Sequence, residues 1–177
     1  MFKRTLAITL CMMMSLYTFC SCSIQSTFSE TDSYSSFDNI QEYKNITIKY
    51  PDILKQEEWE YADIYLCSEE PSFRISVKAH EESKYSYADD PAKQALQLYG
   101  SAMENAEALE MENIRVDDKP AYRQKFRFYD RSYMDYDEYV VFEYKSNIYI
   151  IDFEYYKKDS DNAQTLFDTF IKEIELK

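Results

Sequence analysis

Residues 139–155 constrain the fold more than any other stretch, because they contain two apolar runs on either side of Ser146-Asn147. Asparagine tolerates the positive φ that a tight turn needs, so we predict a β-hairpin with a two-residue turn at Ser146-Asn147. One face of this hairpin is almost wholly apolar, and a slip of one residue would mix the two faces. We expect the hairpin to lie at the centre of a sheet and to carry its core. The predicted cross-strand pairs are Tyr144 with Tyr149, Phe142 with Ile151, Val140 with Phe153, and Glu138 with Tyr155.

Shorter patterns elsewhere in the chain predict further strands and two helices. Alternating apolar residues indicate strands, and apolar residues at helical spacing indicate helices. Asp90 is expected to cap the first helix, and Pro91 suits its first turn. Because hairpins dominate the order, we predict an α+β fold, a mostly antiparallel sheet of about six to seven strands with two main helices packed on it. The additional strands are predicted over 45–51, 61–67, 72–79, 113–116 and 121–129, and the helices over 90–103 and 159–174.

Gly100 is the only glycine, and it lies inside the first predicted helix. It marks either a close approach to a neighbouring element or a residue tolerated at a cost of about 1 kcal/mol. The segment 105–111 that follows either prolongs the helix or forms a loop. A single glycine also argues against a glycine-rich phosphate-binding loop, which needs several such residues.

The formal net charge of −13 excludes nucleic acid as a partner. Nucleic-acid binding depends on neutralising phosphates, and an acidic surface cannot do so. The same surface is repelled by anionic lipid headgroups. We expect the charge to serve solubility rather than recognition of a basic partner.

Residues 1–22 are predicted to be a signal peptide, with a basic start and an apolar run over 6–19 that is too short to span a membrane. Residues 19–22, Phe-Cys-Ser-Cys, resemble the lipobox of bacterial lipoproteins. This resemblance implies lipidation of Cys22 with a diacylglyceryl group. Its two acyl chains, such as palmitate, suffice for stable anchoring. An ordinary secretory leader is the alternative.

The segment 23–40 is rich in Ser, Thr, Asp and Glu and shows no periodicity. We therefore predict a disordered tether between the lipid and a folded domain over 41–177. The domain is expected on the extracytoplasmic face of a bacterial cell membrane, attached through its lipid anchor.

The order of elements in 41–177 resembles the PsbP-like family. The residues that carry the resemblance are an alternating strand that ends in Tyr-Pro at 50–51, the sequence Ala-Tyr-Arg at 121–123, the hairpin at 140–155 and the closing helix at 163–174. The resemblance implies an α/β sandwich, an antiparallel sheet between helices. The family includes photosystem accessory proteins and bacterial lipoproteins of unknown role, and it implies no catalytic residues.

The residue types that catalysis or metal binding needs are sparse. His80 is the only histidine, and we expect an exposed residue at the start of a loop. Cys67 is expected to be a small buried side chain. Acidic clusters at 130–138 and 159–161 lack the glycine of a calcium loop. We therefore expect no enzyme activity, no cofactor and no metal site.

The loop over 129–139 is the best candidate for binding a partner, because tyrosine is enriched in recognition surfaces. Its alternative role is a hairpin connection whose tyrosines cover the sheet edge. We predict a non-catalytic binding or accessory module for an envelope protein. The alternative function is a small-ligand or cation-binding domain with a pocket between sheet and helix. The candidate partner-binding residues are Tyr129, Tyr133, Tyr136 and Tyr139.

A basic stripe is also predicted on the strand at 121–129, where Arg123, Lys125 and Arg127 point outward. An anion or an acidic partner is one interpretation. Cross-strand pairing with outward acids such as Glu143 explains the stripe more simply.

Overall fold

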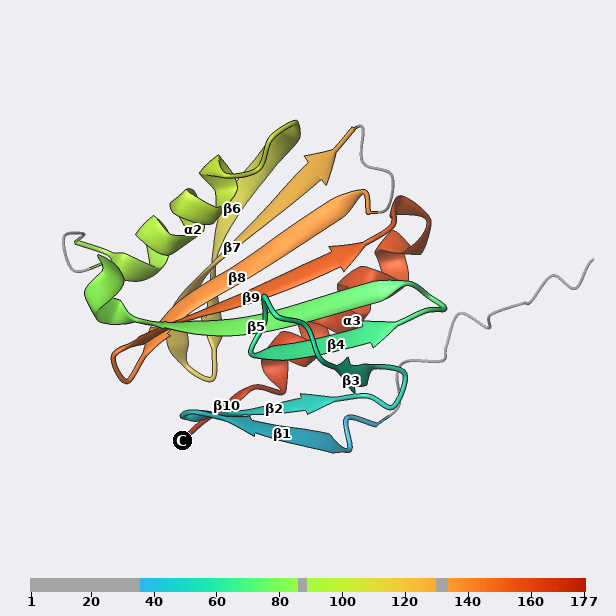
Figure 1. The fold of residues 1–177 in the computed structure, drawn as a ribbon, viewed down its shortest axis with the longest axis horizontal. Helices are drawn as coiled ribbons and strands as arrows, with labels where there is room; N and C mark the ends of the chain where they lie inside the picture. Colours follow the sequence, from blue (N-terminus) through green and yellow to red (C-terminus); the bar gives the residue numbers. More distant parts are fainter. Residues whose placement is uncertain (1–35, 86–88, 130–133) are drawn as a thin grey trace, which may run out of the picture. The chain divides into compact units, whose positions relative to one another are not determined.

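Figure 1 shows the fold in a computed structural model of the chain, which describes residues 36–85, 89–129 and 134–177. These residues belong to one unit that spans Ser33–Lys177. The predicted signal peptide, Cys22 and most of the predicted tether lie outside the described residues.

The larger sheet has seven strands in the order β3-β4-β5-β9-β8-β7-β6, and every neighbouring pair is antiparallel. The predicted hairpin forms β8 and β9, and β9 is the middle strand, so its central place is confirmed. The predicted α+β class with a mostly antiparallel sheet is confirmed as well. The strands are β3 (Lys55–Glu57), β4 (Ile64–Ser68), β5 (Phe73–Glu81), β6 (Ala106–Val116), β7 (Lys119–Phe128), β8 (Tyr136–Tyr144) and β9 (Asn147–Tyr155).

The turn of the hairpin lies one residue earlier than predicted. Lys145 and Ser146 take the positive φ values, 46° and 57°, and Tyr144 pairs with Asn147. The predicted pairs are therefore wrong, but each side chain keeps its predicted face because the register is displaced by an even number of residues. Asn147 begins β9, where its side chain donates a 2.9 Å hydrogen bond to the carbonyl of Lys145. The observed pairs are Phe142 with Tyr149, Val140 with Ile151, Glu138 with Phe153, and Tyr136 with Tyr155.

Both faces of the larger sheet are covered, so its strands contribute to two cores. Helix α2 (Pro91–Ser101) covers one face, and helix α3 (Ser160–Lys172) covers the other together with a three-stranded sheet. That sheet has the order β1-β2-β10. Its strands are β1 (Asn39–Tyr43), β2 (Ile46–Tyr50) and β10 (Glu175–Leu176), and the 3-10 turns η1 (Glu82–Tyr85) and η2 (Lys157–Asp159) lie before the two helices.

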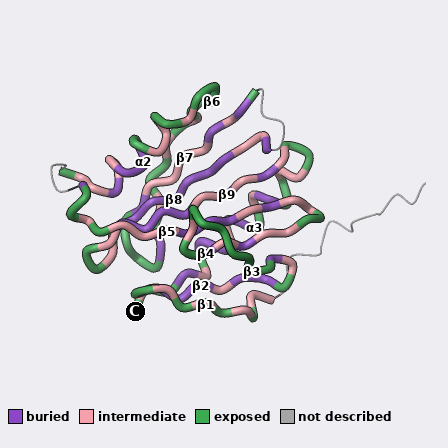
Figure 2. The backbone as a smooth tube through the Cα atoms, in the orientation of Figure 1, coloured by how far each residue is buried: buried purple, intermediate pink, exposed green. Residues whose placement is uncertain are grey.

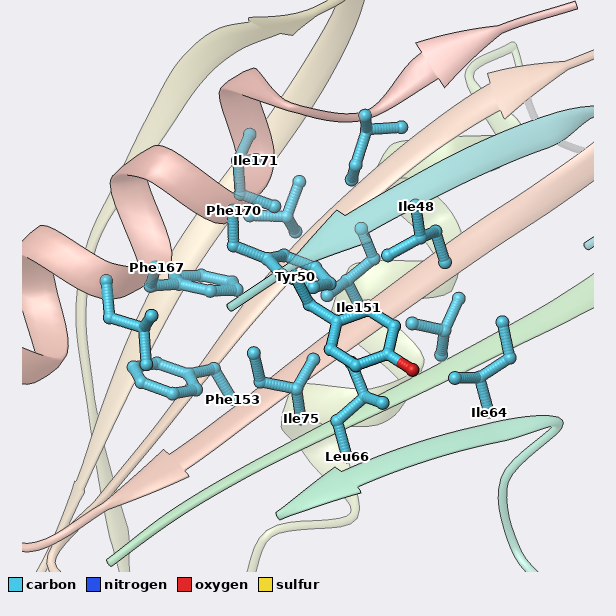
Figure 3. Packing of buried hydrophobic residues seen from close by; sticks show 14 of the residues in the cluster. Ile48, Tyr50, Ile64, Leu66, Ile75, Ile151, Phe153, Phe167, Phe170 and Ile171 are labelled. Atoms are coloured by element: carbon cyan, nitrogen blue, oxygen red, sulfur yellow. The ribbon is translucent and has the colours of Figure 1, made fainter. Parts of the chain in front are cut away.

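The larger core lies between α3, the three-stranded sheet and the larger sheet. Figure 3 shows Ile48 and Tyr50 of β2 among side chains of α3 and the larger sheet. Phe153 stacks on Phe167 of α3 with ring centroids 4.6 Å apart. Fully burying an aromatic or aliphatic side chain of this size stabilises a fold by about 1.5–3 kcal/mol. Figure 2 shows that burial concentrates in the central strands.

Several elements differ from the sequence predictions. The patterns do not predict β1, β3 or β10, which are short and lie at sheet edges. Strand β6 begins at Ala106, so both interpretations of 105–111, helix and loop, are wrong. A bulge between Ala108 and Met111 breaks the alternation that would mark a strand. The predicted tether also ends too late, because Asn39 and Ile40 already belong to β1.

Both helices begin within a residue of their predicted start. The Asp90 carboxylate accepts a 2.9 Å hydrogen bond from the backbone N–H of Lys93, as an N-cap residue does. Asp159 holds the N-cap position of α3 but makes no side-chain capping bond. Gly100 faces Phe126, and a Cβ on Gly100 would lie 2.8 Å from Cζ of that ring. The close-approach interpretation of the glycine is therefore correct.

Candidate functional site

A cavity of about 530 Å³ lies where the end of α2 faces β5, β8 and β9. Small-molecule ligands usually occupy pockets of roughly 300–1,000 Å³. The described lining combines aromatic rings with charged groups. Its principal members are the aromatic residues Trp59, Tyr99 and Tyr139, the carboxylates Glu104, Asp137, Asp152 and Glu154, and Lys78.

The floor of the cavity comes from the polar positions of the central hairpin. Asp152 pairs with Tyr139, and Glu154 pairs with Asp137. Alternate residues of a strand share a face, so these side chains lie on the α2 side of the sheet together with buried Ile150. The helix covers the apolar positions of this face, while the acidic positions line the cavity beside its end.

Asp152 is strongly affected by its surroundings. Burial raises the pKa of its carboxyl group well above the usual range, and the charges of Asp137 and Glu154 raise it further. The Tyr139 hydroxyl donates a hydrogen bond to this carboxylate, and burial raises the pKa of Tyr139 in turn. Asp152 is half-buried as a residue, but its Oδ1 atom is enclosed and accepts no hydrogen bond from any described residue. Because an enclosed carboxylate oxygen without a donor is costly, a ligand that supplies a donor would stabilise the site.

Trp59, which lines the cavity, belongs to an aromatic cluster. Trp59 has 41% of its surface exposed, and its ring centroid lies 5.0 Å from that of Tyr65 and 5.6 Å from that of Tyr61. The Nζ atom of Lys78 lies 5.8 Å from the centre of the Trp59 ring, within the range of a cation–π contact. The indole therefore already accepts one alkylammonium group.

The tyrosines predicted to bind a partner do not gather on one surface. Tyr129 is 63% exposed and hydrogen-bonds to Glu107 and Arg127, and Tyr133 lies outside the described residues. Tyr136 stacks on Tyr155 at 5.2 Å, on the α3 side of the sheet. Tyr139 is only 6% exposed and lies on the α2 side. The predicted loop ends early because β8 begins at Tyr136, and alternation along that strand separates the two tyrosines.

The basic stripe on β7 is not an open surface along its whole length. The Arg123 side chain is 15% exposed and forms ion pairs with Glu138 and with Asp168, the latter at 2.7 Å. Lys125 lies over the Tyr136 ring at 4.4 Å, and burial lowers its pKa. The outward placement predicted for these two residues is therefore wrong, because α3 and its neighbours cover that face. Pairing with a cross-strand acid is confirmed for Arg123, with Glu138 in place of Glu143.

The chain's single histidine lies inside β5 rather than at the start of a loop, so that prediction is wrong. The Nε2 atom of His80 lies 3.0 Å from the Tyr99 hydroxyl, and burial lowers the pKa of the ring. Cys67 is a half-buried free cysteine. Burial raises the pKa of its thiol, and a hydrogen bond with Glu57 raises it further, which disfavours the reactive thiolate.

The sequence patterns do not identify Trp59, Asp137, Asp152 or Glu154 as members of one site. The available signal is the pair of acids at alternate positions in the otherwise apolar run Ile-Ile-Asp-Phe-Glu-Tyr at 150–155. Acids on the apolar strand of a central hairpin must either be paired or face a cavity. Trp59 carries no comparable signal, because its approach to the site depends on how the edge strands fold.

The described residues contain no group of three or more His, Cys, Asp or Glu side chains arranged to hold a metal ion. Within the same ranges, 36–85, 89–129 and 134–177, no helix is long and apolar enough to cross a membrane.

No family model matches the sequence, and no curated protein matches it. Solved structures resemble the fold. The solution structure of cyanobacterial PsbP, CyanoP, from Synechocystis aligns with a TM-score of 0.55 and 15% identity, over 81% of this chain and 95% of that one. A crystal structure from Bacteroides thetaiotaomicron aligns with a TM-score of 0.51 and 14% identity, over 75% of this chain and 45% of that one.

A third structure is LpqN, which is involved in cell envelope biogenesis of Mycobacterium tuberculosis. It aligns with a TM-score of 0.49 and 8% identity, over 74% of this chain and 82% of that one. At such identities a structural likeness shows the fold alone. The resemblance that the sequence predicts is confirmed at that level, and the chain has the PsbP-like fold.

Proposed function

We propose that this chain is a non-catalytic binding domain of a bacterial envelope lipoprotein, and that its cavity between α2 and the sheet binds a small ligand. The observation that carries the proposal is the enclosed Oδ1 atom of Asp152, which lacks a donor at the floor of a cavity of about 530 Å³. Cavities with a mainly preformed shape, aromatic walls and a few convergent polar groups are the usual form of ligand sites.

The lining supports binding rather than catalysis. Its described members include no histidine or cysteine, which are the residue types that most often serve as general base or as thiol nucleophile. His80 contacts Tyr99 from outside the lining. Ligand capture therefore remains the role that these groups can perform.

The proposed test of the cavity is occlusion. Ala102 lines the mouth, so Ala102→Phe should block it, whereas Ser101→Phe places the same ring at the neighbouring exposed position that does not line the cavity. Wild type should show a thermal shift with at least one compound from a panel of cationic, neutral and anionic metabolites. The shift should survive in Ser101→Phe and disappear in Ala102→Phe. Equal shifts in the two variants would remove the cavity from the proposal.

The membrane anchor is proposed at Cys22, from the lipobox resemblance alone. Cells grown with radioactive palmitate should label wild type, and they should also label the Cys20→Ala variant. Cys22→Ala should carry no label and should leave the membrane fraction. Label that persists in Cys22→Ala, or that is lost equally in Cys20→Ala, would contradict the assignment.

A second candidate function is an accessory module that docks on an envelope protein through the end of β7. The supporting observation is Tyr129, which is 63% exposed and precedes the predicted partner residue Tyr133. Substituting both residues with alanine should abolish crosslinking to that protein at the membrane. Tyr61→Ala is the matched control, because Tyr61 is 60% exposed elsewhere on the domain. Crosslinking that persists in the double variant would exclude this surface.

A further inference from the structure

We infer that the ligand of this cavity is a protonated aliphatic amine that carries N–H donors, of the diamine and polyamine class. The inference rests on the proposed function, because it names the occupant of the same site. It follows from the charge of the lining, from the unmet hydrogen-bonding need of one atom, and from the aromatic and apolar walls.

The charge of the lining selects a cation. The described lining residues include four carboxylates and one ammonium group, and Arg74 stands beside the cavity, 3.6 Å from Glu154. Like charges already raise the pKa of Asp152 beyond the effect of burial. A bound cation would relieve this repulsion, whereas an anion would increase it.

The enclosed oxygen of Asp152 selects a cation with N–H groups. Tyr139 donates to the Asp152 carboxylate, while Oδ1 has no donor among the described residues. A primary or secondary ammonium supplies such a donor and forms a charge-assisted hydrogen bond. A quaternary ammonium has the charge but no donor, so it leaves Oδ1 unsatisfied.

The walls select an organic cation over a metal ion. The Lys78 ammonium lies 5.8 Å from the Trp59 ring, which shows that this wall is compatible with an alkylammonium group. Ile150 and Met103 add apolar surface that suits a methylene chain. The described acids do not converge into a group that could hold a metal ion.

The spacing of the floor favours a linear molecule with more than one charge. Asp152 and Glu154 are two residues apart on one face of β9, which separates their Cα atoms by roughly 6.5–7 Å. Two ammonium groups on a short methylene chain can reach both positions.

Trp59 makes the inference directly measurable, because it is the only tryptophan of the chain and it lines the cavity. The full chain, purified in a neutral detergent and excited at a wavelength selective for tryptophan, is titrated with cadaverine and with spermidine. Both should change the Trp59 emission saturably, and added salt should weaken the response. Pentane-1,5-diol, which has the chain without the charge, should give no response. Tetramethylammonium, which has the charge without the donor, should bind at least about tenfold more weakly.

Two substitutions and one control locate the effect. Asp152→Asn removes the charge with almost no change in shape and should weaken cadaverine binding at least about tenfold. Glu104→Gln, at an exposed position of the rim, should weaken it severalfold and tests the inference even if the Asp152 variant folds poorly. Glu112→Gln makes the same charge change at an exposed position outside the lining and should leave the affinity unchanged.

The outcomes separate this inference from the proposed function. Equal responses to cadaverine and pentane-1,5-diol, or an affinity that neither Asp152→Asn nor Glu104→Gln changes, would overturn the amine as ligand. If no amine binds but a compound of another class gives a shift that Ala102→Phe abolishes, the inference fails and the proposed function stands. If no compound of the panel binds, both fail.

Discussion

Replacing Gly100 with alanine tests how closely α2 packs on the larger sheet. A Cβ at this position would lie 2.8 Å from Cζ and 3.2 Å from Cε1 of Phe126, so the ring or the helix must move. Phe126 is 2% exposed and is held by Tyr139, which meets it edge to face at 5.9 Å. The ring therefore has little room to yield.

Two opposing effects set the magnitude for Gly100→Ala. Alanine is favoured over glycine inside a helix by about 1 kcal/mol. Overpacking a closely packed core costs about 1–3 kcal/mol. We therefore expect a net change in unfolding free energy between about zero and a loss of 2 kcal/mol, although helix propensity alone would predict a gain.

The propensity contribution can be measured in the same helix. Gln97 is exposed, so the difference in stability between Gln97→Ala and Gln97→Gly reports the preference of α2 for alanine without a packing cost. Urea unfolding gives the free energies of all variants. Gly100→Ala should fall short of the Gln97 difference by at least about 1 kcal/mol.

A double-mutant cycle identifies the opposing atom. Phe126→Leu removes the ring that faces Gly100, so Gly100→Ala should be less costly in the Phe126→Leu background than in wild type. The reasoning is refuted if Gly100→Ala stabilises the protein by the full Gln97 difference, or if its effect is the same in both backgrounds.

Two further predictions concern buried charge. The pKa of the Asp152 carboxyl is higher in the folded chain than the roughly 3.9 of an unfolded chain. The stability that this group contributes is therefore fully present below the unfolded pKa, and it is lost as the pH rises through the raised folded pKa. Asp152→Asn does not titrate at this position, so its stability relative to wild type should increase from pH 4 toward pH 8 in urea unfolding; a difference that stays constant with pH would contradict the burial of this carboxyl. Arg123→Ala leaves the Glu138 side chain, 3% exposed, without its ion-pair partner and should cost about 3–5 kcal/mol. Arg123→Met combined with Glu138→Leu should cost much less, and an equal loss in both variants would show that packing rather than charge governs this pair. In the pH experiment on Asp152, the charged and phenolic groups that face this carboxyl are Glu104, Asp137, Glu154, Lys78 and Tyr139.

The sequence allowed the faces of the strands to be predicted better than their partners. Alternation identifies which side chains share a face, and the predicted faces of β8 and β9 are correct. The sequence does not locate the exact turn, because Lys145 and Ser146 adopt positive φ although neither residue type favours it as strongly as asparagine does. Nor does it indicate the strand at 106–111, because the bulge in this strand removes the periodic signal.

The cavity was less predictable than the fold. A pocket between helix and sheet was an alternative expectation, but its composition depends on contacts between distant segments. Trp59 and Asp152 belong to opposite halves of the described chain and meet only because β5 pairs with β9 and β4 pairs with β5. Local patterns carry no information on such pairings. Tyr136 and Tyr139 show the opposite case: they are close in sequence, but they lie on opposite faces of the sheet.

The position of β1 has a mechanical consequence. Strand β1 is at the edge of the three-stranded sheet and hydrogen-bonds within that sheet to β2 alone, with Asn39 opposite Tyr50 and the turn at Lys44. A pulling force that enters from the N-terminal side must first detach Phe37 from the larger core and break the 2.8 Å hydrogen bond between the side chains of Asn39 and Asp52. It then breaks the pairing of β1 with β2, beginning at Asn39. The five residues of β1 could then extend by roughly 17 Å. Under tension, β1 would therefore detach before the rest of the domain and lengthen the chain, while the seven-stranded sheet keeps its pairing.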